Sequence, residues 1–263
     1  MKPTVFLGGG RITTALVAGL RLAGDKSRII VVDHHRRKVR HLKRQYGVIA
    51  ESDLHRAVEA AGLLVIAVRP SSVRGLLAEI GKVNRPVVVV SLAAGIPLAR
   101  IRGSLGPRVQ WARAMPSPAC RTLRGLTAVA FSRQTSSRAR RLVKSFFAKV
   151  GAVIEIPERK FDAFTVTYSC SHGYHALATF ADAARRVGLD RSTALTAAAH
   201  ALADGILSWR EGDTSLPELL HEAATPGGIA ATVMSAMDKD GYRHLVEKSL
   251  RAGIARARAN AKS

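Results

Sequence analysis

The first strand of the chain runs directly into three glycines and then into a helical pattern. Residues 4–20 read Thr-Val-Phe-Leu-Gly-Gly-Gly-Arg-Ile-Thr-Thr-Ala-Leu-Val-Ala-Gly-Leu. Gly8 permits a tight turn off the strand, and Gly10 lets a phosphate approach the backbone, which the N–H groups of the next helix then face. The pattern predicts a dinucleotide-binding turn that includes Arg11 and Ile12, with Thr13 in place of the usual third small residue. The alternative is a tight strand–helix turn without a ligand.

A second expected strand, Arg28–Val32, leads to Asp33, which lies about 20 residues beyond the glycines, where a ribose-binding acid is expected. This carboxylate would accept hydrogen bonds from ribose hydroxyls and repel a 2′-phosphate. A basic run of His34, His35, Arg36 and Arg37 follows directly, and such cations suit a 2′-phosphate. The two signals conflict, and we expect NADP or NAD as cofactor with NADPH favoured. The alternative for the basic run is a solvated helix start.

The composition indicates a globular protein, with 47% hydrophobic and 23% charged residues among 263. No apolar run reaches the length of a membrane span, and no signal peptide precedes the first strand, so no membrane partner is expected. Cys120 and Cys170 are the only cysteines. They are too few for a disulfide framework or a zinc site, so we expect no metal and a cytoplasmic location.

The net charge of +22 is unevenly distributed along the chain. Residues 1–160 hold 30 of the 41 Lys and Arg residues and 8 of the 19 Asp and Glu residues, whereas residues 161–263 are neutral overall. The excess is compatible with attraction of an anionic cofactor and substrate, with nucleic-acid binding, or with a generally basic surface. No nucleic-acid module and no set of stacking aromatics accompanies it, which argues against a nucleic-acid partner.

Apolar runs and helical segments alternate up to residue 157. The strands expected after the first two are Leu63–Val68, Pro86–Leu92, Val109–Ala112, Leu126–Phe131 and Ala152–Ile156. Continuous apolar runs of this kind are typical of parallel strands buried on both faces. The order predicts an α/β fold, with a Rossmann-type doubly wound sheet over residues 1–157.

After Pro157 the pattern changes to helices alone. The expected helices are Asp162–Gly188, Ser192–Arg210, Leu216–Glu222, Gly227–Asp240 and Tyr242–Ala259. Several are very apolar for a small bundle, so burial against a second subunit is expected. We therefore predict an all-α dimerisation domain over residues 158–263, which forms a homodimer or a larger homo-oligomer.

Several short motifs follow one another in an informative order. Ala67-Val68-Arg69-Pro70 ends a strand, and Ser91–Ile96, Arg113–Pro118, Pro226–Ala230 and Gly241–Arg243 come later. In this order they resemble the motifs A-V-K-P, S-x-x-A-G-I, R-x-M-P-N-T-P-A, P-G-G-T-T and G-F-R of the pyrroline-5-carboxylate reductase family. The resemblance covers nearly the whole chain. It implies cofactor contacts from the strand-end and loop residues Ala67, Val68, Arg69, Pro70, Ala94 and Gly95.

The departures from the family pattern fall at its substrate motifs. The family's S-G-S-G-P-A-Y is only faintly kept over Ser169–Tyr174, the asparagine after Met-Pro is Ser117, and the second threonine of P-G-G-T-T is Ala230. The resemblance implies that the substrate carboxylate binds N–H donors at a helix N-terminus. It assigns substrate contacts to Ser169, Gly227, Gly228 and Ala230. We expect Ser171 and His172 to be the catalytic residues, although the family has a small residue at the position of His172.

The reaction that the resemblance implies is hydride transfer from a reduced nicotinamide to the carbon of a cyclic imine carboxylate. His172 could replace the missing threonine hydroxyl as proton donor, or it could simply cap or pack the start of a helix. Three hypotheses follow: reduction of pyrroline-5-carboxylate to proline, reduction of another imine or keto acid, and cofactor binding without catalysis.

Overall fold

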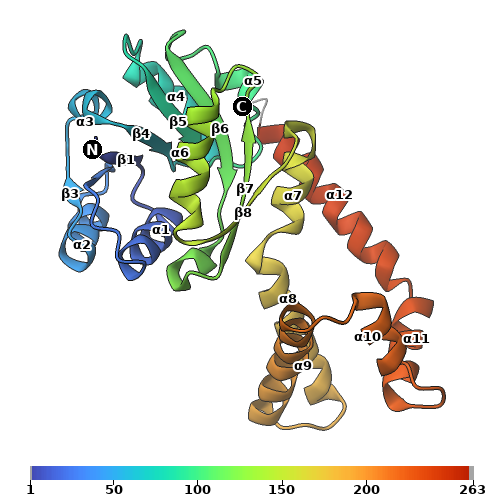
Figure 1. Cartoon of the computed structure of the whole chain (residues 1–263). Helices are drawn as coiled ribbons and strands as arrows, with labels where there is room; N and C mark the ends of the chain where they lie inside the picture. Colours follow the sequence, from blue (N-terminus) through green and yellow to red (C-terminus); the bar gives the residue numbers. More distant parts are fainter. Residues whose placement is uncertain (1, 261–263) are drawn as a thin grey trace. The chain divides into compact units, whose positions relative to one another are not determined.

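The computed structural model describes residues 2–260, which form two compact units (Figure 1). The first unit runs to Tyr168 and takes in the chain again from Ala252, and the second is Ser169–Arg251. The first unit therefore extends beyond the boundary expected at residue 157. The reason is that the fully buried ring of Phe161 packs with Ala128 and Ala130 of the sheet.

The first unit is built on an eight-stranded sheet with the strand order β3-β2-β1-β4-β5-β6-β7-β8. In chain order the strands are β1 (Thr4–Leu7), β2 (Ile29–Val32), β3 (Ile49–Ala50), β4 (Leu63–Ile66), β5 (Val87–Ser91), β6 (Val109–Met115), β7 (Gly125–Phe131) and β8 (Gly151–Glu155). Neighbouring strands are parallel except for β6 and β7, which are antiparallel. A short 3-10 helix, η1 (Pro118–Thr122), joins these two strands, and a connection of this length is too short for a parallel crossover.

Helices cover both faces of the sheet, as the doubly wound prediction requires. α1 (Arg11–Leu22), α2 (Arg36–Tyr46) and α6 (Ser137–Ala148) share one apolar cluster. α3 (Leu54–Ala60), α4 (Pro70–Ile80) and α5 (Leu98–Ile101) share the other. Side chains alternate along β1, so that Phe6 belongs to the first cluster and Val5 and Leu7 to the second. The Rossmann-type prediction is confirmed.

The expected helix Asp162–Gly188 is two helices. A single 3-10 turn, η2 (Glu158–Lys160), leads into α7 (Phe161–Thr167), and α8 (Cys170–Arg186) follows after a break. Tyr168 interrupts the helix with φ −88° and ψ 58°, because its hydroxyl donates to Ser117 Oγ and accepts from the N–H of Leu126, both at 2.8 Å. A propensity pattern does not reveal such a tertiary contact.

The second unit is helical, as expected. It comprises α8, α9 (Arg191–Glu211), α10 (Leu216–Ala223), α11 (Ile229–Lys239) and the first part of α12 (Tyr242–Asn260). Asp190 caps α9 by accepting from two backbone N–H groups, and Ser215 and Glu218 form a capping box at α10. α8 packs along α9. None of the residues of α8, α10 and α11 is buried, so these helices keep their apolar side chains accessible.

Candidate functional site

The glycine turn has the geometry expected of a dinucleotide site. Gly8 has φ +110°, and a Cβ there would lie 2.5 Å from the carbonyl oxygen of Ala67, so only glycine fits. Gly10 is the N-cap of α1, with no side-chain cap and nothing within 4 Å of a Cβ placed on it. The first N–H groups of a helix have no partner within the helix. An anion can therefore reach the N-terminus of α1 over Gly10.

Thr13 replaces the third small residue of the fingerprint without opening the turn. Its side chain is fully buried, and its hydroxyl donates a 2.6 Å hydrogen bond to the carbonyl oxygen of Gly8. The threonine thus ties the first turn of α1 to the end of β1, which is the close helix–strand approach that a small residue usually permits.

Asp33 holds the same turn from the neighbouring strand. Its Oδ2 accepts from the N–H of Gly9 and its Oδ1 from the N–H of His35, each at 2.7 Å. Burial alone would raise the pKa of Asp33, but these two hydrogen bonds and the nearby cation of Lys38 hold that pKa below its ordinary value. Asp33 is therefore ionised at neutral pH. Each oxygen keeps a further lone pair with which it could accept from a ribose hydroxyl.

A cavity of about 690 Å³ lies beside the glycine turn. Of the predicted cofactor residues it is lined by Gly8, Asp33, His34, Arg36 and Val68. Arg40, Glu51 and Glu79 also line it, and these three residues were not predicted from the sequence. Arg40 could have been found, because it lies one helical turn after Arg36 and therefore on the same face of α2. Six predicted residues do not line this cavity. Gly10, Arg11 and Ile12 begin α1, Arg69 and Pro70 begin α4, and Ala67 follows β4.

The loop that follows β5 contains the predicted cofactor residues Ala94 and Gly95. Gly95 has φ +77°, and a Cβ there would lie 2.1 Å from the carbonyl oxygen of Ala257 in α12. The glycine is therefore required by the close approach of α12. This reason is separate from any contact with a cofactor, which stays a prediction for both residues.

The predicted substrate and catalytic residues all lie in the second unit, at two helix N-termini. Ser169 is the N-cap of α8, and its hydroxyl lies 2.6 Å from that of Ser171, while the N–H of His172 donates to the carbonyl oxygen of Ser169. Gly228 is the N-cap of α11, Gly227 precedes it with φ +76°, and Ala230 is exposed on the first turn. Both N-termini suit a carboxylate.

Two observations concern the described residues 2–260 as a whole. None of their helices combines the length and the apolar character that spanning a membrane requires. Within the same residues, no three His, Cys, Asp or Glu side chains are grouped so that they could hold a metal ion.

Two family models match separate parts of the chain. Residues 4–95 match the family model described as "NADP oxidoreductase coenzyme F420-dependent". Residues 158–260 match the model "Pyrroline-5-carboxylate reductase dimerisation". The chain is therefore similar to the pyrroline-5-carboxylate reductase family, which its motifs also resemble.

Similarity to proteins named pyrroline-5-carboxylate reductase extends over nearly the whole chain. The chain is 28% identical to the Mycobacterium tuberculosis reductase, a match that covers 98% of this chain and 96% of that relative. Among solved structures, the Coxiella burnetii reductase has a TM-score of 0.88 at 23% identity and covers 99% of this chain and 98% of its own. The Plasmodium falciparum reductase, solved with NADP bound, has a TM-score of 0.85 at 19% identity and covers 98% of each chain. These two structures share the fold.

Proposed function

We propose that this chain is an NAD(P)H-dependent reductase that converts pyrroline-5-carboxylate into proline. The observation that carries the proposal is that a dinucleotide turn and the helical dimerisation part of this family occur in one chain, which matches named reductases over nearly its whole length. Neither half alone would identify the reaction, since glycine turns of this kind serve many dehydrogenases.

The residues of the first unit fit a dinucleotide. The open N-cap at Gly10 and the free N–H groups of α1 suit its pyrophosphate, and the ionised Asp33 suits a ribose. The bound cofactor would supply a hydride to the imine carbon, while the imine nitrogen takes up a proton. The N-termini of α8 and α11 would hold the substrate carboxylate, with the Ser169 hydroxyl and the Gly227 N–H as donors and Ser171 or His172 nearest the proton transfer. The N–H of Gly228 donates to the carbonyl oxygen of Thr225, so Gly228 would contribute by leaving the start of α11 without a side chain.

The direct test is oxidation of NADPH by the purified chain in the presence of pyrroline-5-carboxylate, with proline quantified as product. Formation of one proline for each NADPH oxidised is the expected result. If the chain bound NADPH but reduced no substrate, it would be a cofactor-binding protein without catalysis. Turnover only with other imines would support reduction of a different substrate.

We further propose that NADPH is preferred and that Arg36 and Arg40 bind its 2′-phosphate, because both line the cavity beside Asp33. Replacing either by alanine should raise the KM for NADPH about tenfold, as expected for the loss of one hydrogen bond to a charged group. The KM for NADH should hardly change. Arg37→Ala is the matched control, because Arg37 is an exposed cation of the same helix that does not line the cavity. Equal effects on the two cofactors would refute this assignment.

A second candidate is reduction of a different imine or keto acid. One observation favours it: Ala230 stands on the exposed first turn of α11, where the family resemblance places a threonine hydroxyl near the imine nitrogen. A site without that hydroxyl could accept a substrate that has no nitrogen to protonate there. A screen of cyclic imines and keto acids against NADPH would identify such a substrate.

We also propose that the chain forms a homodimer through the second unit. Support comes from the match to a dimerisation model and from large apolar side chains that are at least half exposed, among them Leu195, Ile206, Leu216, Leu220, Val233 and Leu245. Sedimentation should show a dimer at micromolar concentration, and a monomer there would refute the proposal.

We also propose a cytoplasmic location, because Cys120 and Cys170 are free thiols.

A further inference from the structure

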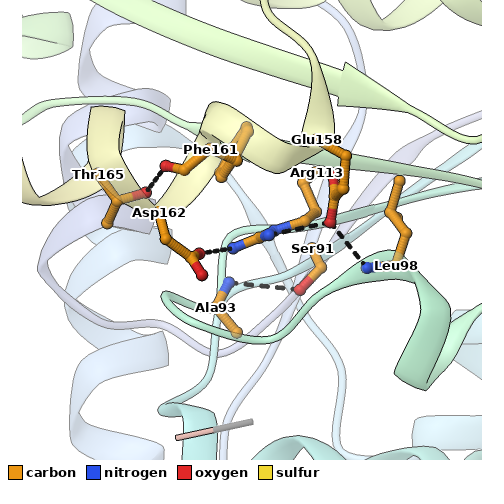
Figure 2. Close-up of polar contacts among 8 residues, drawn as sticks. All are labelled: Ser91, Ala93, Leu98, Arg113, Glu158, Phe161, Asp162 and Thr165. Atoms are coloured by element: carbon orange, nitrogen blue, oxygen red, sulfur yellow. Dashed lines mark hydrogen bonds and ion pairs between the residues drawn. The ribbon is translucent and has the colours of Figure 1, made fainter. Parts of the chain in front are cut away.

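Arg113 on β6 is a charged side chain in the interior of the first unit, with 1% of the side chain exposed. Its guanidinium donates to Glu158 Oε1 at 3.0 Å and to Asp162 Oδ1 at 3.1 Å, and it lies 4.2 Å above the centre of the Phe161 ring. Figure 2 shows these contacts, with both acids reaching the arginine from η2 and α7. One buried cation therefore joins the sheet to the segment that leads out of it.

Glu158 makes a second contact that Asp162 does not. Its Oε1 also accepts a 3.0 Å hydrogen bond from the backbone N–H of Leu98, the first residue of α5 (Figure 2). At the other end of the same loop, the N–H of Ala93 donates to Ser91 Oγ at 3.3 Å. Ser91 is the register partner of Arg113 on the neighbouring strand. A hydrogen bond thus holds each end of the loop from Ala93 to Leu98, and Ala94 and Gly95 lie between these two hydrogen bonds.

Stability alone is a poor explanation for this arrangement. Replacing a buried ion pair by well-packed apolar side chains is often neutral or stabilising. Within the described residues, Arg113 Nε and Glu158 Oε2 are moreover buried atoms without a hydrogen-bond partner, which carries a desolvation cost. A set of charges that contributes little net stability can still fix one backbone position.

We propose that Glu158, oriented by Arg113, is a positioning residue that holds the loop from Ala93 to Leu98 in the geometry required for hydride transfer. The inference rests on the proposed function, because it takes Ala94 and Gly95 as the part of the first unit that contacts the reacting end of the cofactor. Glu158 touches neither substrate nor cofactor in this account. It acts through the N–H of Leu98.

The test compares two variants that each remove one carboxylate from the same guanidinium. Glu158→Ala removes the contact to Leu98, and Asp162→Ala is the matched control that leaves it in place. Glu158→Ala should lower kcat for imine reduction about tenfold, the size expected for one hydrogen bond to a charged group, with an unchanged Kd for NADPH. Asp162→Ala should lower kcat less than threefold. Glu158→Gln, whose amide oxygen can still accept from Leu98, should recover most of the activity.

Hydrogen exchange of the Leu98 amide supplies a readout that does not depend on turnover. It should become faster by at least tenfold in Glu158→Ala and stay near the wild-type rate in Asp162→Ala. Equal losses in the two alanine variants, a Gln variant as impaired as the Ala variant, or unchanged exchange at Leu98 would each overturn the proposal. If the wild-type chain reduces no imine, the proposed function fails, and the exchange comparison alone decides whether Glu158 holds the loop.

Discussion

Replacing Gly10 with aspartate should stabilise the protein while strongly weakening dinucleotide binding. Gly10 has φ −78° and ψ −171°, an extended conformation open to any residue, and a Cβ there meets nothing within 4 Å. Aspartate is a favoured N-cap and exceeds glycine by a few tenths of a kcal/mol. Its charge at the positive end of α1 adds about 0.3–1 kcal/mol. The melting temperature of Gly10→Asp should therefore equal or exceed that of the wild type.

The same carboxylate would face the pyrophosphate. Two unit charges about 4 Å apart interact by about 4 kcal/mol at an effective dielectric constant of about 20, which corresponds to roughly a thousandfold in affinity. Salt screens part of this repulsion at an open site. We expect the Kd for NADPH to rise about a hundredfold to a thousandfold, and the penalty to shrink as salt is added.

Gly10→Ser is the matched control, because serine caps a helix as well as aspartate does but carries no charge. Calorimetric titration with NADPH and thermal melts of the three proteins separate binding from stability. Gly10→Ser should melt between the wild type and Gly10→Asp, because it gains the cap without the charge, and it should lose much less affinity. If Gly10→Asp bound NADPH as tightly as Gly10→Ser, the pyrophosphate could not lie over the N-terminus of α1, and the argument from the glycine turn would fail.

Three further outcomes are expected. Ala230→Thr should raise turnover of pyrroline-5-carboxylate by about one to two decades, as one hydrogen bond to a charged group is worth roughly 1.5–3 kcal/mol; unchanged steady-state rates would contradict this. Burial alone would raise the pKa of Asp25, but hydrogen bonds from Lys149 and Ser27 hold that pKa below its ordinary value. The ionised Asp25 therefore stabilises the folded protein above pH about 4, and this contribution is lost as the pH falls further. Asp25→Asn should therefore melt below the wild type at neutral pH and converge with it in acid, and a constant difference would refute this. Gly95→Ala should cost more than about 1 kcal/mol in urea unfolding, because an alanine is strained at φ +77° and its Cβ would overlap the Ala257 carbonyl; an unchanged midpoint would rule out that contact.

The parts of the fold that could be predicted are those in which a short stretch of sequence determines how the residues pack. The buried strands and the glycine turn were found because apolar runs and glycines report directly on burial and on backbone freedom. The two-residue strand β3 and the helix α6 were missed. The antiparallel β6–β7 pair and the break at Tyr168 were also missed, because both depend on contacts far apart in the sequence.

Some residues of the candidate site could also be predicted from the sequence, and others could not. Gly8 and Asp33 were predicted from spacing alone, and the structure brings them to one cavity. Arg40 escaped notice because only the residues directly after Asp33 were considered. Arg113 was noted as part of a motif, but its partners Glu158 and Asp162 lie 45 and 49 residues further along the chain, and no local pattern connects them.

The helix α12 begins in the second unit and ends in the first, which sets an order of events during synthesis. The loop around Gly95 can pack against α12 only after Ala257 has been translated, because the carbonyl group of Ala257 lies against Gly95. Ribosomes add about 5–20 residues per second, so the nascent sheet waits on the order of ten seconds for this last piece. During that interval the helical unit emerges and can fold while the domain into which it is inserted is still incomplete.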